Sequence, residues 1–404
     1  MLKATDRRTL LAAATGRKND VVRFLRDIVA IPSPSLGEEK VAKRILQEMK
    51  RLKYDDCWID KLGNVIGRIG RGKTRLLLDA HMDAVGVGDP KAWTIDPFKG
   101  KFDGKAVFGR GSCDNKGAVA AQVIGAPLVK DLGLLDDFTL FVIGTVMEED
   151  CDGYGLQFAI EKSLPELDGV CLGEPTNMGV YRGHRGRMEI LVRAPGKSCH
   201  ASAPHRGTNP VYKMAPVVKA IEKLNSKLKD DAFLGKGTVA VTKIECETPS
   251  LNAVPDECSI FLDRRLTVGE TLKSSVAKIK RLKEAKGMKV QVLEYVTRSY
   301  TGQAVRTEKY FPTWVLPESH PLVRAGVQAG RLILGRRPRV GRWVFSTNGV
   351  SSMGRLGVPT VGFGPGNEVV AHSAREYCEV DQLVSAMAFY AAFPGAYLRV
   401  VRGE

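Results

Sequence analysis

Two short segments of the chain place ionisable side chains where they could bind a metal ion and activate water. In His81-Met82-Asp83 the imidazole can bind a metal through one nitrogen, while the carboxylate two residues later can hold the other ring N–H. Glu148 and Glu149 are adjacent, and neighbouring side chains on an extended backbone point in opposite directions. One of these glutamates can therefore hold a metal ion while the other holds a water molecule.

Three further segments carry single candidates. Asp114 lies in the glycine-rich GRGSCDNKG, which lacks the glycine spacing and lysine of a phosphate loop. Either Asp114 caps the helix that follows, or it bridges two metal ions. Glu174 lies in GEPTN, and His372 follows a glycine-rich loop in GFGPGNEVVAHSAREY. Taken singly, each also fits a solvated acidic loop or a histidine satisfied in a turn.

The elements that must position these residues alternate between helix and strand from residue 20 to about 180. VVRFLRDIV and EEKVAKRILQEMKRL have apolar residues three and four apart, whereas RLLLDA, FTLFVIGTV and LDGVCLG are short apolar runs that end in polar loops. This alternation predicts an α/β fold with a mixed, largely parallel sheet flanked by helices, whose functional groups gather beyond the carboxyl ends of its strands.

Five of the candidates are expected at that edge, namely His81, Asp114, Glu149, Glu174 and His372. Two imidazoles and three carboxylates suit a binuclear zinc or cobalt site better than magnesium, which prefers oxygen ligands only.

Between residues 185 and 297 the pattern changes to strand, helix, two strands, helix and strand, which is the order of a ferredoxin-like α+β domain. Helix and strand patterns of the first kind resume after it. We therefore expect a discontinuous domain, 1–184 and 298–404, with 185–297 inserted as a second domain.

Composition narrows the class of protein. The length of 404 residues predicts two or three domains, and 61 Lys and Arg against 45 Asp and Glu give a net charge of +16. Nucleic acid, an anionic surface and a carboxylated substrate all remain possible partners. The eight cysteines include no C-x-x-C pair, which favours reduced thiols in the cytoplasm. No uninterrupted apolar stretch suggests a membrane span. Arg7-Arg8 resembles the start of a twin-arginine export signal, but the apolar run after it is short and ends at Arg17 and Lys18, which favours an N-terminal helix.

Motif order then makes the chain recognisable. H-x-D, GRG-x-x-D-x-KG, EE, GEPT and a late histidine, with G-x-S-x-H in the insert, resemble the metal-dependent amidohydrolases that include acetylornithine deacetylase, succinyl-diaminopimelate desuccinylase, aminoacylase and related carboxypeptidases. YRGHRGRMEI, DRRLTVGET and FSTNGVSSMGRLGVPTVGFGPGNE look like the branch of selenium-metabolism-linked hydrolases of the YgeY type. The resemblance covers nearly the whole chain and implies a zinc-exopeptidase-like catalytic domain with a ferredoxin-like lid and dimerisation domain.

The resemblance also implies roles for the candidates. Asp114 would bridge two ions, most simply Zn²⁺ with Co²⁺ as the alternative. His81 and Glu174 would complete one metal site, and Glu149 and His372 the other. Asp83 would orient His81, and Glu148 would serve as general base and acid.

In the insert, the resemblance makes His200 a lid histidine that helps stabilise the oxyanion, in some members across a dimer. Asn252 and Arg265 would hold carboxylate or carbonyl oxygens of the substrate. Taken without the resemblance, His200 fits a turn histidine and Arg265 a solvated arginine at a strand end. A homodimer is expected on the same grounds.

We therefore predict an enzyme that hydrolyses an amide bond in a small carboxylated substrate such as an N-acyl amino acid or a dipeptide. The alternative is a basic nucleic-acid-binding protein on a degenerate hydrolase scaffold, and a metal-dependent transferase or lyase is a third hypothesis. We expect neither nucleic acid nor membrane as a partner. His184, His205 and His320 are expected to be structural or surface residues, and no cysteine is expected to act as a nucleophile.

Overall fold

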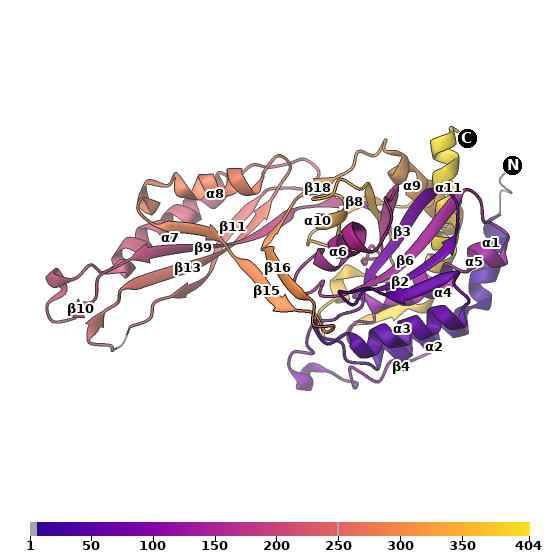
Figure 1. The fold of residues 1–404 in the computed structure, drawn as a ribbon, viewed down its shortest axis with the longest axis horizontal. Coiled ribbons are helices and arrows are strands. Elements are labelled where there is room, and N and C mark those ends of the chain that lie inside the picture. The colour runs from indigo at the N-terminus through magenta and orange to yellow at the C-terminus, as the bar shows by residue number, and fades with distance from the viewer. Residues whose placement is uncertain (1–5, 249) are drawn as a thin grey trace.

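The computed structural model describes residues 6–248 and 250–404 and shows two lobes joined at a narrow junction (Figure 1). The large lobe, on the right of the figure, holds both chain ends and most of the helices. The small lobe extends from it and is built from the middle of the chain.

A nine-stranded mixed sheet forms the centre of the large lobe. Its order is β1-β2-β6-β3-β7-β20-β8-β18, with β19 also paired to β8. The four central strands β6, β3, β7 and β20 are parallel, and the pairs outside them are antiparallel except β19 with β8. The strands are β1 (Asp56–Ile59), β2 (Val65–Gly70), β3 (Thr74–His81), β6 (Phe138–Thr145), β7 (Gly169–Leu172), β8 (Val180–His184), β18 (Trp314–Val315), β19 (Val340–Trp343) and β20 (Thr360–Gly362).

Helices cover both faces of this sheet, as predicted for the α/β fold, because its central strands are apolar on both sides. Most of them share the larger core, while α6 (Tyr154–Lys162) and α10 (Gly349–Ser352) lie on the other face. The larger core includes α1 (Arg7–Gly16), α2 (Lys18–Val29), α3 (Glu39–Arg51), α4 (Lys116–Gly125), α5 (Leu128–Asp131), α9 (Pro321–Leu334) and α11 (Val380–Arg402). A small sheet, β4 (Lys101–Phe102), β5 (Ala106–Phe108) and β21 (Tyr377–Glu379), lies at its margin.

Among the described residues, helix α11 alone is long and apolar enough to be compared with a membrane span. By length and composition this 23-residue helix could cross a membrane, but 78% of its most apolar window is buried inside the protein. It packs against α9, α4 and α1. A scan for uninterrupted apolar runs does not select it, because Ser385 and the interior Pro394 interrupt the apolar residues.

The small lobe has the predicted ferredoxin-like order of elements. Its sheet runs β11-β13-β9-β14, and every pair is antiparallel. Helices α7 (Pro210–Ser226) and α8 (Leu272–Lys280) pack against it over a core separate from that of the large lobe. The strands are β9 (Gly186–Pro195), β11 (Thr238–Glu245), β13 (Glu257–Leu266) and β14 (Lys289–Val292), with the short pair β10 (Cys199–His200) and β12 (Ala253–Val254) at the far end. This separate core supports the division at residues 185 and 297, which we keep as a proposal.

One expected strand is divided in two. The sequence pattern predicts a single strand from residue 289 to 296, but β14 ends at Val292 and β15 (Glu294–Arg298) pairs instead with β16 (Ala304–Glu308). The hairpin contacts the large lobe through its tip, where the Tyr300 hydroxyl donates to the Gly63 carbonyl over 2.9 Å. The alternating side-chain pattern continues through the bend, so the sequence carries no signal for it.

The connection between the lobes is a two-stranded ribbon. Strand β8 leads into β9 with only Arg185 between them, and the returning strands β17 (Tyr310–Phe311) and β18 pair with β9 and β8 respectively. Phe311 lies opposite Arg187, and Trp314 lies opposite His184. The outgoing and returning chains therefore support each other across the junction.

Candidate metal centre

The predicted site residues of the large lobe all lie at the carboxyl ends of its parallel strands or in loops beside them. His81 is the last residue of β3, Glu148 and Glu149 follow β6, and Glu174 follows β7. Asp114 lies just before α4, and His372 follows β20 and the short turn Glu368–Val370. Strands that run parallel end on the same side, which brings these side chains together around one pocket.

Asp114 lies between the two histidines. One of its carboxylate oxygens is 3.0 Å from Nε2 of His81, and the other is 3.2 Å from Nε2 of His372. Nε2 of His372 is also 3.2 Å from Oε2 of Glu149. A carboxylate flanked by two imidazoles in this way can contact two ions at once.

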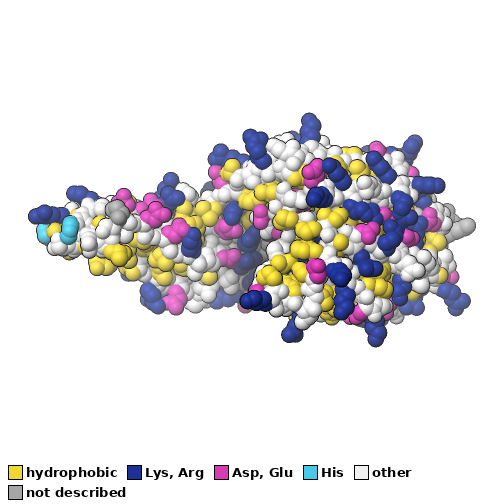
Figure 2. Space-filling view, turned by 90° about the horizontal axis from the view of Figure 1, so that it is seen from below, with side chains coloured by type: hydrophobic (Ala, Val, Ile, Leu, Met, Phe, Trp, Pro, Cys, Tyr) yellow, Lys and Arg dark blue, Asp and Glu magenta, His cyan; other side chains and the backbone are white. Residues whose placement is uncertain are grey.

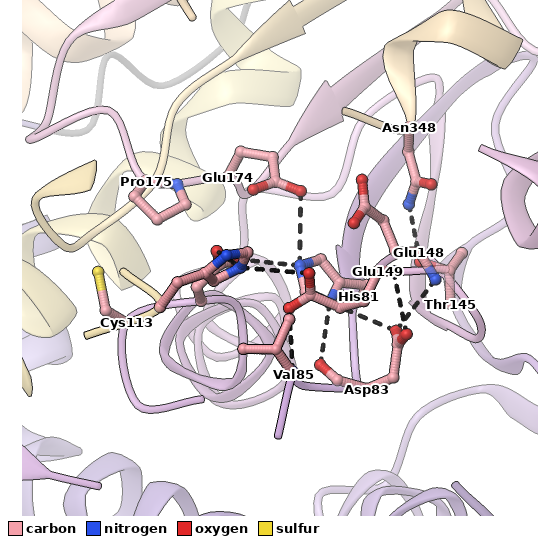
Figure 3. Close-up of polar contacts among 12 residues, drawn as sticks. His81, Asp83, Val85, Cys113, Thr145, Glu148, Glu149, Glu174, Pro175 and Asn348 are labelled. Atoms are coloured by element: carbon pink, nitrogen blue, oxygen red, sulfur yellow. Dashed lines mark hydrogen bonds and ion pairs between the residues drawn. The ribbon is translucent and has the colours of Figure 1, made fainter. Parts of the chain in front are cut away.

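Glu174 and Glu148 lie on the other side of His81. Oε1 of Glu174 is 3.7 Å from Nε2 of His81. Two overlapping groups have ligand atoms within 4.8 Å of one another: His81 with Glu148 and Glu174, and His81 with Asp114 and Glu149. Figure 3 shows these side chains converging around His81. The structure thus brings the predicted base Glu148 into the same group of potential ligands as His81 and Glu174.

Asp83 fixes both His81 and the loop of the two glutamates. Nδ1 of His81 is 3.0 Å from the Asp83 carbonyl oxygen and 3.4 Å from its carboxylate. The same carboxylate accepts hydrogen bonds from the backbone amides of Glu148 and Glu149, at 3.2 and 3.1 Å (Figure 3). The Nδ1 contacts fix the ring so that Nε2 of His81 points to Asp114 and Glu174.

The cluster holds more carboxylates than imidazoles, so positive charge would stabilise it. Hydrogen bonds to Asp114 and Glu149 raise the pKa of His372 to about 10. Burial opposes a charged His81, yet Asp114 and Asp83 raise its pKa well above the usual range. Burial raises the pKa of Glu148 and of Glu174 well above that of an ordinary carboxyl group. Divalent ions would supply the positive charge that protons on the histidines supply here.

The donor set fits such ions. The imidazole of His372 and several carboxylates line one pocket of about 300 Å³, and Nε2 of His81 contacts two of those carboxylates, Asp114 and Glu174. His81 and Glu174 are buried, whereas the His372 side chain is 52% exposed and lies at the mouth of the site. His372 also has a backbone φ of 58°, in the left-handed region that ordinary residues rarely adopt.

Of the three predicted residues in the small lobe, the structure brings only Arg265 to this pocket. His200 is exposed on β10, and Asn252 is exposed beside it, with its carbonyl accepting from the Ala201 amide over 2.7 Å. Strand β10 lies at the end of the small lobe remote from the large lobe (Figure 1). Within one chain, His200 and Asn252 therefore do not reach the metal cluster.

Sequence reasoning missed Glu376. Its Oε1 accepts hydrogen bonds from the backbone amides of Cys113 and Asp114, both over 3.0 Å, and its Oε2 is 2.6 Å from Nη1 of Arg110. Glu376 thereby holds the loop that carries Asp114. A glutamate that acts through backbone amides has no spacing signature, and only its place four residues after His372 hinted at a role.

The other three histidines occupy structural or surface positions. His184 is buried and hydrogen-bonded at the junction, and His205 is exposed. His320 caps α9, because its ring nitrogen accepts a hydrogen bond from the Leu322 amide. All eight cysteines are free, and burial raises the pKa of Cys113, next to Asp114, well above its usual range. A neutral thiol is a poor nucleophile.

The chain matches the peptidase family M20/M25/M40 over residues 77–395 and belongs to that family. It is thus a metal-dependent amidohydrolase of the peptidase class, as the motif order indicated.

Individual relatives cover nearly the whole chain. The uncharacterised protein YgeY of Escherichia coli K12 is 44% identical over 400 residues, which cover 98% of this chain and 99% of that protein. A putative LysW-lysine/LysW-ornithine hydrolase of Pyrobaculum aerophilum is 30% identical, covering 90% and 94%. The crystal structure of YXEP of Bacillus subtilis, described as a dinuclear metal-binding peptidase of the M20 family, matches with a TM-score of 0.68 at 16% identity, covering 96% and 99%. The resemblance to the YgeY type is confirmed.

Proposed function

We propose that the protein uses two divalent ions to hydrolyse an amide bond in a small carboxylated substrate, such as an N-acyl amino acid or a dipeptide. The observation that carries this proposal is the position of Asp114, whose two carboxylate oxygens lie 3.0 Å from His81 and 3.2 Å from His372. Glu148 is buried in the same pocket.

Asp114 would bridge the two ions. His81 and Glu174 would complete one site, and Glu149 and His372 the other, in agreement with the contacts around each imidazole. The mixture of nitrogen and oxygen ligands favours Zn²⁺, with Co²⁺ as the alternative. The two ions would polarise the scissile carbonyl and acidify a water molecule.

Glu148 is the proposed general base. It would accept a proton from the attacking water and pass it to the nitrogen of the leaving amine. Asp83 would hold Glu148 in place through its backbone amide and His81 through Nδ1. Arg265, on the small-lobe side of the pocket, would bind the substrate carboxylate.

The small lobe would complete the site in a homodimer. His200 is exposed on a strand pair at the tip of the lobe, and from there it could enter the pocket of a second copy and help stabilise the oxyanion. We further propose a cytoplasmic location, since all eight cysteines are free thiols. The full set of candidate ligands in one pocket speaks against a degenerate scaffold that only binds nucleic acid.

Two substitutions test the proposal on zinc-reconstituted enzyme, assayed with N-acetyl, N-succinyl and N-carbamoyl amino acids and dipeptides. Glu148→Ala should keep both metals and lower turnover by about 10²–10⁴-fold, the usual contribution of a general base. Asp114→Ala should lose both metals. The exposed Glu161→Ala, on α6, is the matched control.

Metal content by mass spectrometry and detection of free amine and free acid are the readouts. Full activity of Glu148→Ala would refute its role as the base. Turnover that releases no free acid would instead indicate a transferase or a lyase.

A further inference from the structure

Two arginines of the small lobe lie directly opposite each other at the edge of the metal pocket. In the pairing of β9 with β13, Arg187 is the register partner of Arg265, so both side chains point to the same face of the sheet. Both line the pocket that holds Asp114, Glu148 and Glu174.

Each arginine is held in place by the protein yet keeps unused donors. Arg265 donates from Nε and Nη2 to Asp263, over 2.8 and 3.1 Å. Arg187 donates from Nη2 to Asp152 over 2.9 Å and from Nη1 to Glu189 over 3.5 Å, and its guanidinium packs 4.6 Å from the centre of the Phe311 ring. Among the described residues, the buried Nε of Arg187 has no hydrogen-bond partner.

Acidic side chains offset the repulsion between the two guanidinium groups: Asp152 and Glu189 pair with Arg187, and Asp263 pairs with Arg265. Like charges directly opposite each other in a sheet still repel, and the buried Nε–H of Arg187 is left without an acceptor among the described residues. Arg185 and Arg342 add further positive charge nearby. Burial lowers the pKa of Arg185, and the charges of Arg265 and Arg342 lower it further. Nη1 of Arg342 is also buried without a partner among the described residues.

We propose that Arg187 and Arg265 together form a two-guanidinium clamp for a substrate carboxylate that lies remote from the scissile amide. A planar guanidinium matches the geometry of a carboxylate, and two of them can bind both of its oxygens. This inference rests on the proposed function and narrows the substrate class to amides that carry a carboxylate away from the metal centre. Arg187 is then a specificity residue in addition to Arg265.

A pair of small acids separates the clamp from the metals. Glutarate and its monoamide, glutaramate, each have one carboxylate that can reach the metal ions. Only glutarate has a second carboxylate for the clamp. Isothermal titration calorimetry on the zinc-loaded protein should give an affinity at least about tenfold higher for glutarate, as expected for one charge-assisted bidentate contact.

Arg187→Met should reduce this preference to about twofold or less while leaving the zinc content unchanged. Arg187→Lys, which keeps the charge but loses the planar fork, should fall between these values. Arg193→Met is the matched control, because it removes an arginine of the same strand far from the pocket and should leave the preference intact.

Equal binding of the two acids by the unaltered protein would overturn the clamp, and so would an undiminished preference in both Arg187 variants. The panel of N-acyl amino acids and dipeptides tests the proposed function separately. A clamp without amide hydrolysis would refute that function alone, whereas hydrolysis without acid discrimination would refute the clamp alone.

Discussion

Glu376 contacts the backbone of the loop that carries Asp114 rather than the Asp114 side chain. Because two amide hydrogen bonds and the ion pair with Arg110 converge on this one carboxylate, Glu376→Gln should loosen the loop. Residues that support ligands in this way typically contribute 10–100-fold to metal affinity. We expect zinc affinity to fall by about that factor, measured by competition with a chromophoric chelator.

Glu379→Gln is the control, since Glu379 is exposed only three residues further along the chain. Glu376→Gln should also unfold at a lower temperature than Glu379→Gln, because it breaks the buried ion pair with Arg110, so zinc affinity is measured well below that transition. Unchanged zinc affinity in Glu376→Gln would show that the loop holds Asp114 without this carboxylate.

At this scale the sequence predicted which side chains meet but not what holds them. His81, Glu149 and Glu174 follow apolar runs, so the parallel sheet alone places them at one edge. Glu376 and Arg187 escaped notice because their partners are distant in sequence or belong to the backbone. His200 and Asn252 matched a motif, but a motif does not reveal that its residues lie at the remote end of a lobe.

Strands β8 and β18 and the loop before α10 meet at His184. Its Nε2 accepts hydrogen bonds from the Trp314 indole over 2.8 Å and from the Thr347 amide over 3.1 Å, and Nδ1 lies 2.8 Å from the Arg185 carbonyl. Burial lowers the pKa of His184 to about 4. Only the neutral ring fits this arrangement.

This depressed pKa predicts acid sensitivity of the junction. The unfolded chain binds a proton at His184 near pH 6.5, but the folded protein does so only near pH 4, so its stability is complete above pH 6.5 and falls as the pH drops towards 4. At pH 5 the loss should be about 2 kcal/mol. Urea unfolding at pH 7.5 and pH 5 measures it.

His184→Gln should abolish most of this pH dependence, because the amide oxygen can accept the same two hydrogen bonds without titrating. The exposed His205→Gln should leave the dependence unchanged. A His184→Gln protein that loses as much stability on acidification as the unaltered chain would contradict the assignment.

The tip of the β15–β16 hairpin is hydrogen-bonded to the large lobe. Tyr300 donates to the Gly63 carbonyl over 2.9 Å, and Thr301 donates to the Lys61 carbonyl over 2.7 Å. Gly63 has a φ of 113°, and a side chain there would clash with the Tyr300 ring.

Tyr300→Ala should loosen the tip of the hairpin and speed proteolytic cleavage within residues 294–308 several-fold, while Arg306→Ala should not.

Elements with strong periodicity were predictable. The helices near residues 20–50, the ferredoxin-like order and the closing helix near residue 381 follow from apolar spacing. The β15–β16 hairpin was not predictable, because β14 and β15 share one alternating pattern and only contacts with residues distant in sequence separate the two strands. The burial of α11 was equally hidden, since its composition also suits a membrane.

At the scale of the whole molecule, the proposed dimer can be tested by mixing inactive variants. His200→Ala and Glu148→Ala would each be inactive alone, but a mixed dimer would contain one site with both residues intact. Random exchange of subunits in equal amounts should restore roughly a quarter of the original activity. Sedimentation should show a dimer throughout, and an absence of restored activity despite subunit exchange would place His200 outside the partner's site.

The net charge of +16 is spread over the surface of the large lobe on the face shown in Figure 2. On the face shown in Figure 2, lysines and arginines are dispersed among acidic and apolar side chains of the large lobe. The arginines that bear on the proposed chemistry are those beside the metal pocket. This distribution agrees better with attraction of small anionic substrates than with binding along a nucleic acid.

The paired strands at the junction restrict how the lobes can move. Sliding of β9 past β17 would break the register of Arg187 with Phe311, whereas bending and twisting would preserve it. The two-stranded ribbon should therefore permit rotation of the small lobe relative to the large lobe but resist sliding of one lobe along the other. Arg187 and Arg265 lie next to the junction, so such a rotation would displace them little. His200, on β10 at the far end of the small lobe, would move much further. One modest rotation could thus carry the tip to or from a neighbouring molecule and leave the arginine pair almost stationary beside the metals.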